Sequence, residues 1–193
     1  MTLSNLEKVD NFQMTNPFWN FSLEVYSKKG VSDACIALQE KCGVDVNILL
    51  FCCWTASVGH PVLSKHEVTL LCRSAADWNY DIVQKLRSVR KSFKIKNYEC
   101  DEEEVRQLQN QILEVEIKAE QIEQFKLMRT ITVLEDDSVT EIQRINNALE
   151  NISLYFSMPE LSSTCHTSEL LNLLDGVFSK VHKTDIKLVL EQT

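Results

Sequence analysis

Glycine and proline are scarce in this chain, whose 193 residues contain four glycines and three prolines. A phosphate-binding loop requires clustered glycines and a nucleophile elbow requires the pattern G-x-S-x-G, so both kinds of site are excluded. The chain also lacks a convincing alternation of apolar and polar residues, which argues against strands. The few glycines and prolines mark expected helix ends, because proline favours the first helical position and glycine the position after the last.

The seven cysteines and four histidines show none of the spacings of a zinc site or a disulfide framework. The patterns C-x-x-C, H-x-x-x-H and H-E-x-x-H are missing, and so are the Glu-x-x-His pairs of di-iron bundles. An odd number of cysteines fits a reducing compartment better than secretion. The sequence indicates no metal, no cofactor and no catalytic residue.

Positive charge is in deficit, with a formal net charge of −8 and an isoelectric point near 5.1. Generic binders of nucleic acid or anionic membranes are basic, so this balance argues against both. The longest apolar run is shorter than the roughly 20 residues that cross a bilayer, and the N-terminus lacks a signal-peptide pattern. We expect a cytoplasmic protein with no membrane contact.

Capping residues and glycines predict three helices in the first sixty residues, at 17–29, 32–42 and 46–58. Asn16 and Asp45 are the expected N-terminal caps, since their side chains accept hydrogen bonds from the first turn. The third segment, VNILLFCCWTA, is apolar on every side, which indicates a helix buried all round. We interpret its adjacent cysteines, Cys52 and Cys53, as small buried hydrophobic residues and not as a redox or metal site.

Two capping boxes, Ser64-Lys-His-Glu67 and Ser138-Val-Thr-Glu141, predict further helix starts. Apolar residues recur every three or four positions between 80 and 94 and between 142 and 156. The longest expected helix runs from Asp101 to about Arg129 with a strict three-four alternation, typical of a coiled-coil seam. Its seam consists of Val105, Leu108, Ile112, Val115, Ala119 and Ile122.

The predicted fold class is therefore all-α, a single-domain helical bundle. Residues 1–157 form the bundle, in which the helices after Asp101 and Ser138 pack antiparallel as a long hairpin over about 101–157. Residues 158–193 form a C-terminal loop and helical extension. Its short tail is expected to dock either on the bundle or on a partner.

One region is basic, the segment WNYDIVQKLRSVRKSFKIK from Trp78 to Lys96. On a helical wheel Arg87, Lys91 and Lys94 share a stripe with Tyr80. We interpret this stripe first as a solvated face. Binding of an acidic partner and, more weakly, contact with nucleic acid through 85–96 stay open.

Arg90 lies near the apolar face of this segment, because it follows Leu86 by four residues. A guanidinium at the edge of a core must be paired, since its desolvation is otherwise costly. Glu116 and Glu123 flank the seam of the long helix, so we predict that they pair with Arg90 in an ion cluster. The cluster is either a structural ion network or a ligand-binding site.

Asn47 stands in the first turn of the apolar helix, where its amide either assists the cap, the favoured interpretation, or reaches a buried partner. Trp78, like Trp19, Tyr26 and Trp54, is a core residue by default. Beside an Arg/Glu cluster such aromatic residues would also line a small-molecule pocket.

Three segments resemble a family of small proteobacterial proteins of unknown function: FWNFSLEVYSKKGVSDACIALQEKCGVDVNILLFCCW, DWNYDIVQKLRSVRKSFK and EVEIKAEQIEQ. The resemblance covers roughly residues 17–156 and leaves out the segment after Met158. It implies a bacterial cytoplasmic protein and supplies no activity. Positions that fit its pattern include Trp78, Leu86, Arg87, Arg90, Glu116, Ala119 and Glu120.

The leading hypothesis is a non-enzymatic protein-interaction or regulatory module with a protein partner or a second copy, because a protruding hairpin suits binding to another helix. The alternative is a small-molecule binder or enzyme that uses the Arg/Glu cluster near Trp78. Nucleic-acid contact through the basic helix is the weakest hypothesis. The candidate ligand or partner residues are Asn47, Trp78, Tyr80, Arg87, Arg90, Glu116, Glu120 and Glu123.

Overall fold

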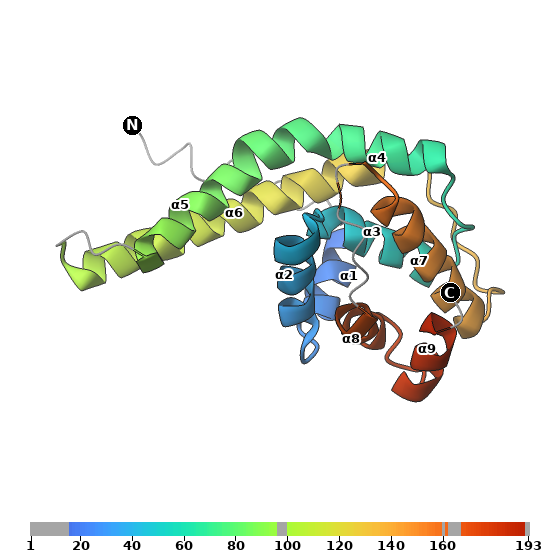
Figure 1. Cartoon of the computed structure of the whole chain (residues 1–193). Helices are drawn as coiled ribbons and strands as arrows, with labels where there is room; N and C mark the ends of the chain where they lie inside the picture. Colours follow the sequence, from blue (N-terminus) through green and yellow to red (C-terminus); the bar gives the residue numbers. More distant parts are fainter. Residues whose placement is uncertain (1–15, 96–99, 160, 162–166, 192–193) are drawn as a thin grey trace.

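The computed structural model describes residues 16–95, 100–159, 161 and 167–191, and within these ranges it contains helices and no strand (Figure 1). The predicted all-α helical bundle is confirmed. The elements in chain order are α1 (Pro17–Tyr26), α2 (Val31–Cys42), α3 (Val46–Ser57), α4 (Lys65–Trp78), the π-helical turn η3 (Asn79–Val83), α5 (Gln84–Ile95), α6 (Glu102–Thr130), α7 (Glu141–Phe156), α8 (Thr167–Val177) and α9 (Lys183–Leu190). None of the described helices is long and apolar enough to cross a membrane.

The helix starts follow local capping chemistry. The side chains of Asn16 and Asp45 accept hydrogen bonds from the first turns of α1 and α3, and the capping box at Ser64 is complete. The capping box predicted at Ser138 is wrong by two residues. Thr140 caps α7 instead, together with Gln143, while Ser138 donates its hydroxyl to the Asp136 carboxylate over 2.6 Å.

Helix α3 is the centre of the core. All its residues from Val46 to Ala56 are buried, and it packs chiefly along α7. Burial raises the pKa of both thiols, Cys52 and Cys53, so these side chains stay uncharged inside the core. This confirms the interpretation of the apolar segment as a helix that is buried all round.

The long antiparallel hairpin exists, but α6 pairs with a different partner from the predicted one. Helix α6 packs against α4, η3 and α5, which run beside it in Figure 1, whereas α7 packs against α3. The link between α6 and α7 passes the C-terminal end of α3, where the amide of Asp136 donates to the carbonyl of Val58 over 2.9 Å. Apolar periodicity shows that a helix face is covered, but it does not identify the covering helix.

The C-terminal helices dock on the same core. Helix α8 packs on α2, α9 packs on α7 and α8, and the side chains of Leu173, Leu174 and Ile186 are fully buried. A side chain at Gly176 would meet Val31 at 2.4 Å, which explains a glycine inside α8. Of the two sites expected for the tail, the structure therefore supports the bundle.

Two regions follow from this packing. We call α1, α2, α3, α7, α8 and α9 the body. We call α5 with residues 102–118 of α6 the arm, because in Figure 1 these two helices extend side by side beyond the other helices. Of the predicted site residues, Arg87 and its partner Glu116 lie where the arm meets the body, since Arg87 also bonds Gln39 of α2.

Candidate functional site

Arg90 of α5 is held by a single carboxylate of α6. Its Nε lies 2.6 Å from Glu116 Oε2 and its Nη2 lies 2.9 Å from Glu116 Oε1, a two-pronged contact between a guanidinium and a carboxylate. Burial alone would raise the pKa of Glu116, but the hydrogen bonds from Arg90 and Arg87 outweigh it and hold that pKa below its usual value. The predicted pairing of Arg90 is confirmed for Glu116.

Arg87 extends the cluster toward the body. It donates from Nε to Glu116 Oε1 over 3.3 Å, from Nη2 to Glu120 Oε1 over 2.6 Å, and from Nη1 to the side-chain oxygen of Gln39 on α2. Arg87 therefore does not belong to a solvated stripe, which corrects that interpretation. Burial raises the pKa of Glu120 even though Arg87 faces it and acts in the opposite direction.

Glu123 is not a partner of Arg90, and this part of the prediction is wrong. Glu123 lies about one turn of α6 beyond the ion cluster and is fully buried. Its carboxyl group accepts hydrogen bonds from the side-chain amides of Asn47 (3.0 Å) and Asn79 (3.1 Å). The Asn47 oxygen in turn accepts from Gln124 Nε2 over 2.8 Å. The side chain of Asn47 thus reaches buried partners across to α6 and does not assist the cap.

Asp45 and Glu123 form a carboxyl pair. Their side chains lie within hydrogen-bonding distance of each other, which requires that one of them carries a proton. Burial, followed by the proximity of Asp45, raises the pKa of Glu123 to about 10, so Glu123 is the protonated partner at neutral pH. The backbone of Asp45 is held at 2.7 Å by the Tyr155 hydroxyl, which accepts from its amide.

The two aromatic candidates lie outside the cluster. Trp78 donates its indole N–H to the carbonyl of Ala119 over 2.9 Å and so ties α4 to α6. Tyr80 is 67% exposed, and the Nζ atom of Lys85 lies over its ring, 5.8 Å from the ring centre. Neither residue lines the two cavities described next.

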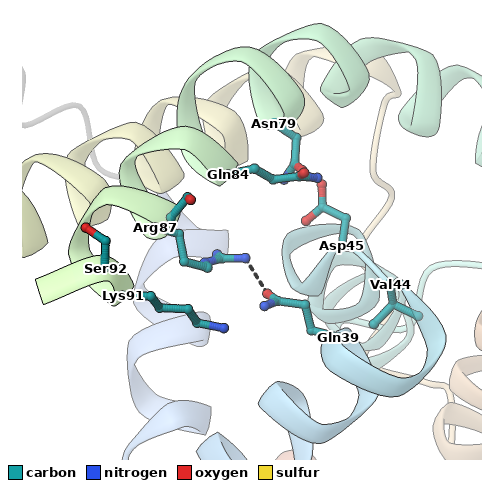
Figure 2. Close-up of a pocket in the computed structure, with 10 residues that line it drawn as sticks. Gln39, Val44, Asp45, Asn79, Gln84, Arg87, Lys91 and Ser92 are labelled. Carbon is teal, nitrogen blue, oxygen red and sulfur yellow. Dashed lines mark hydrogen bonds between the residues drawn. The ribbon is translucent and has the colours of Figure 1, made fainter. Parts of the chain in front are cut away.

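Two cavities flank Arg87 and Asp45. The first, of about 570 Å³, lies between α2 and α5 (Figure 2), and the second, of about 260 Å³, lies between α1, α3 and α6. The first is polar, lined by Gln39, Gly43, Val44, Asp45, Asn79, Gln84, Arg87, Ser88, Lys91 and Ser92. The second adds an apolar wall that includes Trp19, Leu23, Tyr26, Leu50 and Ile117. Within the described ranges, no three His, Cys, Asp or Glu side chains are grouped as metal ligands.

Several site residues were missed from the sequence. Asp45 was identified only as a helix cap, and Gln39, Gln84 and Gln124 were not named as candidates. Asn79 was missed as well, and the structure places it at the start of the π-turn, where its amide donates to Glu123 of α6. No pattern in the sequence marked Gln124, although it and both its neighbours, Glu123 and Phe125, are buried in the structure.

A comparison with family models matched residues 17–127 to the family described as "Protein of unknown function (DUF2390)". The chain belongs to this family. The DUF2390 match confirms the resemblance stated from the sequence, and it covers every residue that lines the two cavities, whereas α7, α8 and α9 lie beyond it. Comparisons with curated proteins and with solved structures gave no match.

Proposed function

We propose that this protein binds a small anionic molecule in the cavity between α2 and α5. The proposal rests mainly on one observation: the largest of the described cavities is lined by two cations, Arg87 and Lys91, together with serine and amide groups. Ligand sites are concave and carry a few polar groups that converge on the ligand. Figure 2 shows both cations extending from α5 toward Gln39.

Hydrogen-bond donors are in excess in this cavity. Arg87 uses three N–H groups on Glu116, Glu120 and Gln39, and a guanidinium has five. Lys91 uses one of its three on Glu40, at 2.9 Å. The remaining donors suit a carboxylate or phosphate, which only accepts hydrogen bonds.

An acceptor stands opposite these donors. Asp45 lines the same cavity, and Figure 2 shows its side chain near Asn79 and Gln84. Its carboxylate favours a ligand that also carries a hydroxyl or ammonium donor. The expected ligand class is therefore a small carboxylate or phosphate with such a donor, for example an amino acid, a 2-hydroxy acid or a sugar phosphate.

Calorimetric titration with one compound of each of these three types tests the proposal. We expect at least one to bind the wild type, and we expect Lys91→Met to lower its affinity about tenfold, because one charge-assisted hydrogen bond is lost. Lys85→Met is the matched control, since Lys85 lies on the same helix, pairs with Asp81 at 2.7 Å and does not line the cavity. Failure of all three compounds to bind, or equal effects of the two substitutions, would overturn the proposal.

A second candidate function is the interaction module that the sequence favoured. The observation behind it is the arm, part of whose surface is aliphatic and not covered by the body. Contact with nucleic acid has less support, because the chain has a formal net charge of −8 and proteins that bind nucleic acid are typically basic.

A further inference from the structure

The uncharged polar side chains along the second cavity bond to other protein groups. The Ser22 hydroxyl lies 3.2 Å from Oε1 of Gln124, and Nε2 of Gln124 donates to Asn47 Oδ1 over 2.8 Å. The amide of Asn47 donates in turn to Glu123. Polar groups that already have partners gain little from a ligand. The surface that this cavity offers to a ligand is therefore mainly its apolar wall.

Charged side chains line the same cavity at Asp45, Arg87 and Glu120. Arg87 is the only cation among the described residues that line it, and it already pairs with Glu120 over 2.6 Å and with Glu116 over 3.3 Å. Carboxylates thus outnumber cations here, which leaves Asp45 in excess. Such an excess attracts a cationic group of a ligand, for example an ammonium.

The two cavities share part of their wall. Arg87, on α5, and Asp45, at the N-terminal end of α3, line both of them, and Figure 2 shows the two side chains in the first. A ligand head group bound between Arg87 and Asp45 therefore lies where the cavities adjoin. The second cavity, at about 260 Å³, is larger than the apolar cavity of about 150 Å³ that suffices for benzene, so it has room for an aromatic ring.

We propose that the ligand is an amino acid with an aromatic side chain, held by its carboxylate at Arg87 and Lys91, by its ammonium at Asp45, and by its ring in the second cavity. The inference rests on the proposed function, because the head group uses the first cavity. It narrows the three expected ligand types to one. A sugar phosphate has no apolar part for the second cavity, and a 2-hydroxy acid has no cation for Asp45.

Calorimetric titration of the full chain with phenylalanine, serine and 3-phenyllactate tests the two parts of this ligand. We expect phenylalanine to bind about tenfold or more tightly than serine, because its ring is buried against the apolar wall. We expect phenyllactate to bind about tenfold more weakly than phenylalanine, because a hydroxyl replaces the ammonium that faces Asp45.

A substitution in the apolar wall tests where the ring lies. Ile117 lines the second cavity and is 42% exposed, so Ile117→Asn should leave the fold intact, which circular dichroism checks. We expect this variant to bind phenylalanine about fivefold more weakly. Leu113→Asn is the matched control, because Leu113 lies one turn earlier on α6, is 39% exposed and lines neither cavity.

The outcomes separate this inference from the proposed function. Equal affinities for phenylalanine and serine, or equal effects of the two asparagine substitutions, would overturn the aromatic side chain. Phenyllactate binding as tightly as phenylalanine would overturn the ammonium. Binding of a sugar phosphate without binding of phenylalanine would overturn the amino acid and leave the anion site of the first cavity in place. If no compound of any type binds, the proposed function fails as well.

Discussion

Helices α3 and α6 are held in the protein by different forces. Every residue of α3 from Val46 to Ala56 is buried, and most of their side chains belong to the hydrophobic core. Helix α6 has 29 residues, and the few that it buries include Glu116, Glu123 and Gln124. Apolar burial is strong but non-directional, whereas charged hydrogen bonds require particular distances and angles. The body is therefore stabilised mainly by packing, and the position of the arm is specified by polar contacts.

The difference bears on why the polar cluster is present. A buried ion pair contributes little net stability, because desolvation of both charges offsets their attraction. The Arg87–Glu116–Glu120 cluster is thus a poor means of stabilising a bundle. It places a guanidinium and a carboxyl pair beside two cavities, and this placement is what the proposed binding requires.

The largest effect is expected in the body. Phe51→Ala removes a fully buried ring that packs edge-on against Phe18, with ring centres 5.1 Å apart. We expect the free energy of unfolding to fall by about 3–5 kcal/mol, from lost burial and the cavity left behind. Urea unfolding measures it, with Ile36→Ala, 47% exposed, as a control that changes little. If Phe51→Ala lowered the free energy of unfolding no more than Ile36→Ala does, the result would contradict a core centred on α3.

An intermediate effect is expected at the junction. Glu116→Ala leaves Arg87 and Arg90 without their shared carboxylate, and we expect a loss of about 2–3 kcal/mol in the free energy of unfolding. Glu114→Ala is the control, because Glu114 is exposed on the same helix. If the two substitutions cost the same, the cluster does not hold the arm.

A pH-dependent effect, smaller per pH unit than the two effects above, is expected for Glu123→Gln. Because the folded pKa is raised, the stabilising contribution of the protonated group is complete below about pH 4.5 and is lost as pH rises toward 10. The slope for one such group is at most about 1.4 kcal/mol per pH unit. Glutamine cannot ionise, so the free energy of unfolding of the variant should increase relative to that of the wild type as pH rises.

Urea unfolding from about pH 5 to about pH 9 measures this gain for the wild type and the variant. Glu114→Gln should give a difference from the wild type that does not change with pH, since that side chain is exposed. If the difference in unfolding free energy between the wild type and Glu123→Gln also stays constant with pH, then Glu123 is ionised in the folded protein.

Local features of the fold could be predicted because their causes are local. Caps such as Asp45 act within one turn, and the all-apolar segment around Phe51 can only be interior. The partner of α6 could not be predicted, since Leu108 and Val115 continue its heptad pattern although they are partly exposed. A repeat records that a face is apolar, whether its own chain covers it or not.

The site was predicted in part for the same reason. Arg90 needed a carboxylate near the seam, and simple helix geometry pointed to Glu116. Glu123 was assigned to the wrong partner because its actual partners, Asn47 and Asn79, come from α3 and from the π-turn. The apolar periodicity of the sequence does not reveal that α3 packs against α6, and it does not reveal the extra residue in the π-turn.

The π-turn joins α4 to α5 at the wall of the cavity, so a rotation of α5 about this turn would act as a lever with its pivot at the cavity. Asn79 opens the turn and Gln84 follows it, joined by a hydrogen bond of 2.7 Å, and both line the cavity beside Arg87. Beyond the pivot α5 has twelve residues, about 18 Å at 1.5 Å per residue, so a tilt of about 10° displaces its far end by about 3 Å. Small movements at the cavity wall are thus geometrically magnified at the end of the arm.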